Sequence, residues 1–297
     1  MVAALRPRSI ADRTFGVGIV LFFVCFCATI LYPFWNIVLT SFSTPGSVNH
    51  LGFRLWMAEW TLRPYRYSLS AYGNILVGYA NSVLRVVAGT ALTIAMTFLF
   101  AYPLSKRDLP GRSAITMYIV ITMFFSGGLI PLYLLVRKLG LMDSRLSLIL
   151  PLVANGFYII IMRNFLMTID AAYEESAMID GAGYPTIATR IVLPLSKAVT
   201  ATIALWTAVA HWNEWFFAML FIDDRDKWVL QYILRRMLTD LQMVRRDMVA
   251  WDERVDLLPT VAVRSAMTVL TIGPIILVYP FLQRFFIKGV FVGSLKG

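Results

Sequence analysis

The chain has 297 residues, of which 59% are apolar and only 15% are charged, and its mean hydropathy is +0.70. Soluble globular domains carry about 25% charged residues, so this composition excludes an ordinary soluble enzyme and predicts an all-α polytopic membrane protein. The formal net charge of +10 is interpreted as charge flanking a lipid membrane, with no nucleic acid as partner, because no basic run alternates with aromatic residues.

The chain begins with a basic segment, residues 1–14, followed by a long apolar run. No small-residue cleavage site follows this run, so we expect a retained membrane anchor and not a signal peptide. Cys25 and Cys27 lie inside the run and have no second cluster of ligands beside them, so they are interpreted as packing thiols. Because the chain has only two His residues and no Cys near them, we expect no metal site.

Apolar segments long enough to span a membrane recur along the chain, since a spanning helix needs about 20 mostly apolar residues. Lys and Arg divide almost evenly between the two sets of loops, but discounting the long loop 223–260 favours a cytoplasmic side for both termini. The sequence predicts six spans: Phe15–Thr40, Tyr79–Pro103, Ala114–Val136, Leu146–Leu166, Ala198–Ile222 and Val261–Phe286.

Polar and helix-breaking residues interrupt several of these spans. Arg85 lies about one turn inside the second span, where it either snorkels to the interface or faces a pore. In the third span, Gly127, Gly128 and Pro131 predict a kink or a broken helix, with close helix packing as the alternative. Asn155 in the fourth span must face protein or water.

The stretch Asp170–Pro194 lies between the fourth and fifth spans and begins with an acidic segment. Asp170 is a plausible N-cap and Gly181 a plausible left-handed C-cap, which together predict a short helix over Ala171–Asp180. A helix this short is marginal alone and favours docking on a cytoplasmic protein. Anionic lipid would repel it, and an ordinary solvated loop helix is the remaining alternative.

The fifth span contains HWNEWF, which starts at His211 and is the most polar stretch inside any span. A buried carboxylate at Glu214 is costly unless it is paired, so it either has a partner on a neighbouring helix or lines an aqueous path. His211 lies three residues earlier on the same helical face and could pair with it. In the external loop 223–260, apolar residues at helical spacing predict a helix that packs on the membrane surface or receives an external protein: Val229, Ile233, Leu234 and Met237.

The stretch Asp170–Pro194 also resembles the EAA loop of ABC importer permeases. The family pattern is E-A-A, three residues, G, nine residues, I, one residue and L-P. Every interval is matched here by Glu175, Ser176, Ala177, Gly181, Ile191, Leu193 and Pro194, with Ser176 replacing the usual Ala.

The resemblance covers nearly the whole chain and is to the sugar-importer permeases of the maltose type, within the branch that handles aldouronate or alginate fragments. Asn81-Ser82, the IPLYLL that starts at Ile130, the WNEW that starts at Trp212 and the tail 281–297 also resemble family patterns. This resemblance implies a type I ABC importer permease fold in a bacterial inner membrane, with a permease domain over 15–287 and a cytoplasmic tail over 288–297.

By this resemblance, a cytoplasmic coupling helix contacts the ATPase through Glu175, Ser176, Ala177, Asp180 and Gly181. The implied partners are a second permease, two ATP-binding subunits and an extracytoplasmic solute-binding protein. The chain lacks the phosphate loop G-x-x-x-x-G-K-[ST], so it is expected to be no enzyme, and ATP and Mg are expected on the partner subunits, with no cofactor in this chain. We expect the substrate path at Asn155, Trp212, Asn213, Glu214 and Arg85.

Two further hypotheses come from other functional classes. A proton-coupled secondary transporter would use Glu214 and His211 as a relay and would show inverted repeats, which are not apparent in the sequence. A membrane scaffold would use the acidic helix only to tether a cytoplasmic protein.

Overall fold

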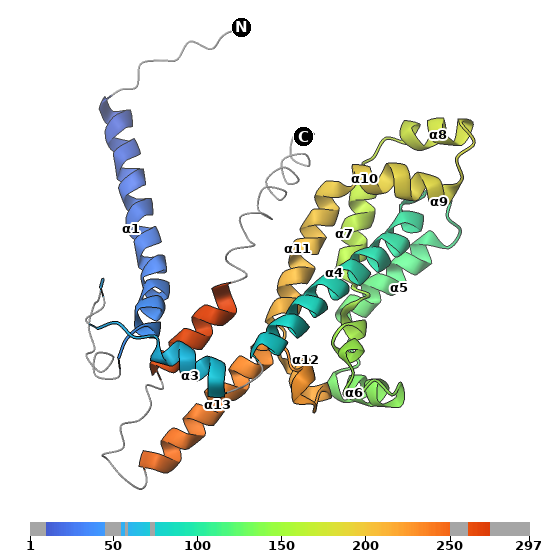
Figure 1. The fold of residues 1–297 in the computed structure, drawn as a ribbon. Coiled ribbons are helices and arrows are strands. Elements are labelled where there is room, and N and C mark those ends of the chain that lie inside the picture. Colours follow the sequence, from blue (N-terminus) through green and yellow to red (C-terminus); the bar gives the residue numbers. More distant parts are fainter. Residues whose placement is uncertain (1–9, 45–54, 57–58, 72–74, 250–260, 274–297) are drawn as a thin grey trace. The chain divides into compact units, whose positions relative to one another are not determined.

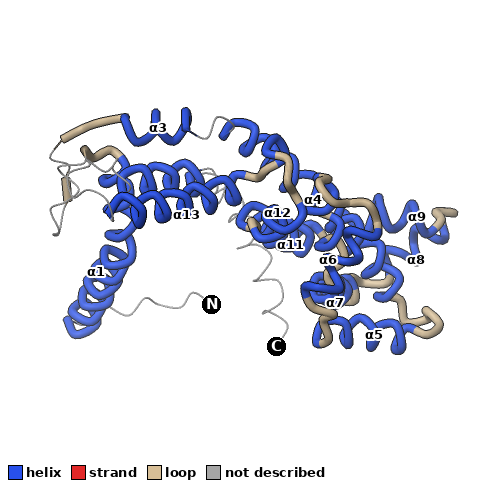
Figure 2. Tube along the Cα trace, turned by 90° about the horizontal axis from the view of Figure 1, so that it is seen from below, coloured by secondary structure: helices blue, strands red, loops and turns tan. Residues whose placement is uncertain are grey.

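The computed structural model describes residues 10–44, 55–56, 59–71, 75–249 and 261–273, and in these ranges every regular element is helical (Figures 1 and 2). The α-helices are α1 (Ile10–Ser41), α3 (Arg63–Ala71), α4 (Ile75–Ser105), α5 (Arg112–Phe124), α6 (Leu129–Lys138), α7 (Gly156–Leu166), α8 (Ala172–Ile179), α9 (Tyr184–Ile187), α10 (Leu193–Leu195), α11 (Lys197–Asn213), α12 (Phe216–Phe221), α13 (Leu230–Val249) and an unlabelled helix over Val261–Gly273. Short 3-10 helices cover Arg145–Leu148, Leu150–Leu152 and Arg225–Lys227, and a π-helical turn covers Ala188–Val192.

The chain divides into two compact units, residues 1–71 with 241–270 and residues 72–240 with 271–297. In the first unit, α1 exposes apolar side chains along most of its length, as expected of a helix that faces lipid or other helices. At its end, Phe42 stacks on Trp60 with ring centroids 5.2 Å apart, and the hydroxyls of Ser41 and Tyr65 lie 2.8 Å apart. These contacts attach α3 to the end of α1.

The second unit is built around α4, which packs along both α7 and α11. Gly89 allows the close approach of α4 and α11, because the His211 ring lies 2.4 Å from where a Cβ at Gly89 would stand. The core of this unit is the buried cluster Phe98, Ala101, Tyr102, Leu104, Ile119, Ile159, Met162, Leu166, Ala177, Ile187, Ala188, Val192, Val199 and Ile203.

Two of the predicted spans are continuous helices in the structure, and three are bent or broken. The first two predicted spans lie within α1 and α4, the two described helices that are long and apolar enough to cross a membrane unaided. Three bent pairs bring the described total to up to five spans, with bends of 112° between α5 and α6, 51° before α7 and 78° before α11. The break predicted in the third span is confirmed at residues 125–128, where Gly128 has φ 84°.

The fourth and fifth predicted spans are not continuous helices in the structure. The fourth starts as 3-10 turns, and its α-helical part begins only after Asn155, whose side chain accepts hydrogen bonds from the first backbone N–H groups of α7. The fifth is interrupted at Glu214, which is extended with φ −78° and ψ 118°. Backbone polar groups freed by such breaks need other partners inside a membrane, so these positions matter for the site.

The remaining expectations concern the ends of the chain and the loop 223–260. The helix predicted in loop 223–260 is confirmed as α13, and Val229, Ile233 and Met237 are buried. The last predicted span is described as a helix over Val261–Gly273. Residues 274–286, the tail 288–297 and residues 1–9 lie outside the described residues.

Candidate functional site

Helix α8 is a short helix with a closed structure at each end. The Asp170 carboxylate accepts a hydrogen bond from the Ala172 N–H at 3.0 Å, as an N-cap does, and the start of the helix at residue 172 agrees with the prediction to within one residue. At the other end Gly181 has φ 83°, and the Ala182 N–H donates to the Ala177 carbonyl at 2.9 Å while the Gly181 N–H donates to Met178 at 3.0 Å. This is a Schellman motif, so the predicted glycine cap is confirmed.

The two faces of α8 differ in their environment. Ala177 is its one buried residue, and Glu174, one helical turn earlier, keeps only 14% of its side chain exposed. Tyr173, Met178 and Ile179 are exposed, Ile179 at 86%. One face therefore holds α8 to its own unit, while apolar side chains on the rest of the helix stay uncovered. The sequence-predicted residues Glu175, Ser176, Asp180 and Gly181 are also exposed.

The face of α8 that packs on its own unit, formed by Glu174 and Ala177, is joined to the end of α4 by a charged contact. The Lys106 ammonium forms an ion pair with the Glu174 carboxylate. The same ammonium lies 4.5 Å from the centroid of the Tyr102 ring, and the Tyr102 hydroxyl donates to Glu174 at 3.4 Å. Glu174 was not singled out from the sequence; the only hint was its position in the acidic first turn of the predicted helix.

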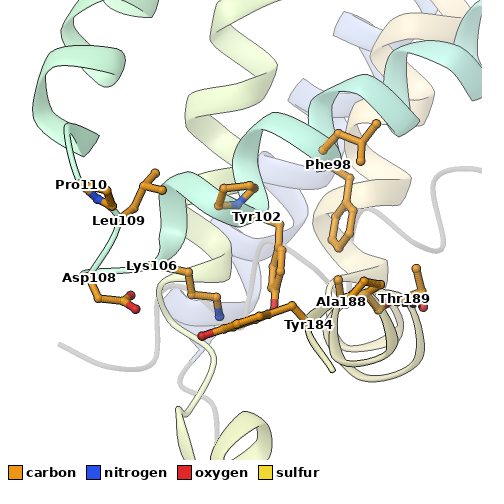
Figure 3. Close-up of a pocket in the computed structure, with 12 residues that line it drawn as sticks. Phe98, Tyr102, Lys106, Asp108, Leu109, Pro110, Tyr184, Ala188 and Thr189 are labelled. Atoms are coloured by element: carbon orange, nitrogen blue, oxygen red, sulfur yellow. Dashed lines mark hydrogen bonds between the residues drawn. The ribbon is translucent and has the colours of Figure 1, made fainter. Parts of the chain in front are cut away.

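A pocket of about 540 Å³ lies beside this contact, between the end of α4, the loop 106–110 and α9 (Figure 3). Its walls are mainly apolar and include Phe98 and Pro110. Figure 3 shows the side chains of Tyr102, Lys106 and Tyr184 turned toward one another at the pocket. Side chains of the chain itself leave this space open, so the end of α4 and α9 have room to move relative to each other.

Near the opposite end of α4, Arg85 and Glu214 form a second ion pair, 2.6 Å from Nη2 to Oε2. The Arg85 side chain is only 3% exposed, so it does not snorkel to an interface, and its charge is matched by a carboxylate that is 18% exposed. The Arg85 Nη1 also donates to the Glu214 carbonyl at 2.9 Å. Thus one arginine satisfies both the carboxylate and the backbone carbonyl exposed by the break after α11.

Glu214 also starts the next helix. Its Oε1 accepts a hydrogen bond from the Phe217 N–H at 2.6 Å, which satisfies one of the free donors in the first turn of α12. The predicted pairing of Glu214 with His211 is wrong, since α11 ends at Asn213 and Glu214 leaves the helical face that the two would share. His211 instead packs its ring against Gly89.

The other residues expected along the substrate path occupy different environments. Asn155 is exposed and uses its side-chain oxygen to cap α7, accepting from the Phe157 N–H at 2.9 Å. Trp212 is buried and donates from its indole nitrogen to the Thr271 carbonyl at 3.3 Å. Asn213 is exposed at the end of α11, next to Glu214. The structure therefore brings Arg85 and Glu214 into contact and leaves Asn155 on a separate helix.

A buried polar network at the start of α4 was missed by reasoning from the residues alone. The Asn81 amide donates to the Asp226 carbonyl at 2.8 Å and to the Trp228 carbonyl at 3.0 Å, and its oxygen accepts from Arg145 at 3.0 Å. The Ser82 hydroxyl accepts from the Leu230 N–H at 2.9 Å. These bonds fasten the segment before α13 to α4.

An exposed ion pair lies in the loops on the same side as this network. Lys227 donates to both the carboxylate and the backbone carbonyl of Asp143, each at 2.9 Å, and reaches Asp224 at 3.2 Å. The hydrogen bond from Lys227 holds the pKa of the Asp143 carboxyl below its ordinary value, and the bond from the Asp224 backbone N–H acts in the same direction.

These features define a class of protein: a polytopic helical membrane protein with broken spans, a buried ion pair and a projecting capped helix. Comparison with known proteins gives the family. Residues 112–292 match the family described as "Binding-protein-dependent transport system inner membrane component". The chain belongs to this family.

Relatives over the full length support the same assignment. The chain is 40% identical to Protein LplC of Bacillus subtilis (strain 168), covering 97% of this chain and 96% of the relative. It is 39% identical to the polygalacturonan/rhamnogalacturonan transport system permease protein YtcP of the same organism, covering 96% and 99%.

A solved structure also matches, that of a bacterial ABC transporter involved in the import of the acidic polysaccharide alginate. The TM-score is 0.83 at 31% identity, covering 95% of this chain and 100% of that chain. The chain is thus a non-catalytic permease subunit of a sugar or oligosaccharide ABC importer, a multi-pass inner-membrane protein of a family without a cofactor of its own. Membership of this family replaces the alternative hypothesis that the chain is a proton-coupled secondary transporter.

Proposed function

We propose that α8 is the coupling helix through which ATP-binding subunits drive this permease. The observation that carries the proposal is the capped helix whose apolar side chains, Tyr173, Met178 and Ile179, are exposed although the helix is acidic and hydrophilic at its start. Uncovered apolar side chains on a short helix favour docking into a groove of another protein. Of the coupling residues expected from the sequence, Glu175, Ser176, Asp180 and Gly181 would contact the ATP-binding subunit, and the buried Ala177 would hold the helix to its own chain.

The same proposal sets the arrangement in the membrane. Six spans, with both termini, the loop 170–194 and the tail 288–297 in the cytoplasm and the loop 223–260 outside, place α8 where ATP is available. The partners would be a homologous permease that completes the pore, two ATP-binding subunits that hold ATP and Mg, and an external solute-binding protein.

We propose further that the transported sugars are oligosaccharides that carry uronate carboxylates. Support comes from the names of a 39% identical relative and of the matching solved structure, which concern polygalacturonan/rhamnogalacturonan and alginate. The substrate path would run past Asn155, Asn213 and Glu214. Arg85 would hold Glu214, and Trp212 would position the end of α11 through its bond to Thr271.

The test is sugar-stimulated ATP hydrolysis by the complete complex in proteoliposomes. Gly181→Asp adds a side chain and a negative charge at φ 83°, a conformation that Asp tolerates better than most residues, so its main effect is on the docking contact, and Glu175→Lys reverses an exposed charge on the docking face. We expect both to reduce stimulated hydrolysis by about tenfold or more or to detach the ATP-binding subunits. Unchanged hydrolysis and uptake in both would refute the coupling role.

The substrate class is tested separately in the wild-type complex. Uronate oligosaccharides and neutral oligosaccharides of equal length are compared as stimulators, each with its binding protein. Stimulation by the uronates alone supports the proposal, whereas stimulation by the neutral sugars alone overturns the substrate class without touching the coupling role.

A further inference from the structure

We infer that the contact of Glu174 with Lys106 and Tyr102 transmits the movement of α8 to α4. The inference rests on the proposed coupling role of α8 and adds residues outside the EAA pattern. Glu174 and Lys106 would be positioning residues: they touch neither the ATPase nor the sugar but determine whether the movement of one helix reaches the other.

The two neighbouring acids on α8 have different environments. Glu175 is exposed, whereas Glu174 is 14% exposed and engaged by its own chain. If an ATP-binding subunit binds the exposed face and moves α8, the force passes through the residues that hold α8 to its own unit, Ala177 and Glu174. Ala177 contributes one methyl group to the core, while Glu174 forms an ion pair and accepts a phenolic hydrogen bond.

The contact on α4 is made by two residues at the same end of the helix. Lys106 follows directly after the last residue of α4, and Tyr102 lies in its last turn, so both report on the end of one helix. Lys106 binds the Glu174 carboxylate and also lies over the Tyr102 ring. A carboxylate held by a cation and a hydroxyl from the same helix end resists both pulling and sideways displacement better than an apolar contact would.

Helix α4 is continuous over 31 residues, whereas the predicted spans around it are bent or broken. At a rise of about 1.5 Å per residue, Tyr102 and Arg85 lie about 25 Å apart along the same helix. Figure 1 shows α4 running from the vicinity of α12 to that of α8 and α9. A displacement applied at Tyr102 therefore reaches Arg85, which holds the break between α11 and α12.

Open space lies beside the end of α4. The pocket of about 540 Å³ is lined by Lys106 from the end of α4 and by Tyr184 from α9, and its open space leaves room for displacement (Figure 3). The ion pair bridges from α4 to α8 at the edge of this space. Removing it would leave α8 able to move with the ATPase while α4 stays in place.

The experiment measures uptake and ATP hydrolysis together in proteoliposomes that contain the full complex. For Glu174→Gln and Lys106→Gln we expect the ATP-binding subunits to remain attached and hydrolysis to continue, while sugar imported per ATP falls about tenfold. Lys106→Arg keeps the charge and should transport normally. Arg107→Gln, which removes the exposed cation next along the chain, is the matched control.

The decisive variant exchanges the charges, Lys106→Glu with Glu174→Lys. Recovery of most of the imported sugar per ATP in the exchange variant supports a direct pair, because two residues that act independently would not rescue each other. Normal transport in Glu174→Gln or in Lys106→Gln, or no recovery in the exchange variant, overturns the inference.

A failure of the coupling role itself looks different. In that case Gly181→Asp and Glu175→Lys transport normally as well. If Glu174→Gln detaches the ATP-binding subunits, Glu174 belongs to the docking face, and the transmission role is wrong while the coupling role stands.

Discussion

The two ends of α4 are held in different ways. At the start, Asn81, Ser82 and Arg85 are all at most 6% exposed and bind three separate segments, with three hydrogen bonds formed by Asn81, two by Arg85 and one by Ser82. At the other end, the Leu104 carbonyl accepts hydrogen bonds from Arg112 and Arg163, and α4 is joined to the short projecting helix α8 by the pair of Lys106 and Glu174, whose side chains are 25% and 14% exposed. The buried network at the start fixes the geometry of α4 against its neighbours, whereas the more accessible pair at the other end connects α4 to a helix that projects from the unit.

The largest effect on this difference between the two ends is expected from replacing Arg85. Arg85→Gln leaves the Glu214 carboxylate and carbonyl without their cation, and loss of one partner of a buried ion pair costs about 3–5 kcal/mol. We expect a large drop in the melting temperature of the purified complex and loss of uptake. Arg107→Gln is the control, and a melting temperature equal to that of the control would show that the pair is not structural.

A smaller effect is expected from the network at Asn81. Asn81→Ala removes two donors to carbonyls before α13 and the acceptor for Arg145, and unsatisfied buried groups cost about 1–3 kcal/mol. The segment 226–230 should then exchange its backbone amides faster, as measured by hydrogen–deuterium exchange. Exchange unchanged in this segment would mean that Ser82 alone fastens it.

The smallest effect belongs to the exposed pair of Asp143 and Lys227. The pKa of Asp143 is lowered in the folded chain, so its contribution is present above the pKa that this carboxyl has when unfolded and is lost as pH falls through the lowered value. Asp143→Asn should lower the melting temperature slightly at pH 7, and this difference should shrink as the pH falls below about 4. A difference that grows toward acid pH would contradict this sign.

Part of this arrangement could be predicted from the residues. The caps of α8 follow from Asp170 and Gly181, because capping is a local matter of side chain and backbone angle. The break in the third span follows in the same way from its glycines. The need for a partner at Glu214 was also predictable, since a lone carboxylate is costly among apolar helices.

The identity of that partner was not predictable. The helical periodicity favoured His211, three residues away, but the chain breaks at Glu214, and the true partner lies 129 residues earlier on α4. The Asn81 network and the Glu174 contact are likewise formed between distant segments. No local pattern encodes which helices become neighbours, so such pairs emerge only from the packing of α4 against α7, α11 and the segment before α13.

The central claim is that ATP-driven movement of α8 reaches the break at Glu214 through α4. It is tested most directly by hydrogen–deuterium exchange of the segment 214–222, in which Glu214 caps the Phe217 N–H, with and without ATP in the full complex. We predict that ATP changes the protection of this segment in the wild type and in Arg107→Gln, and that the change disappears in Glu174→Gln while ATP hydrolysis continues. The same ATP-dependent change in Glu174→Gln would contradict the claim.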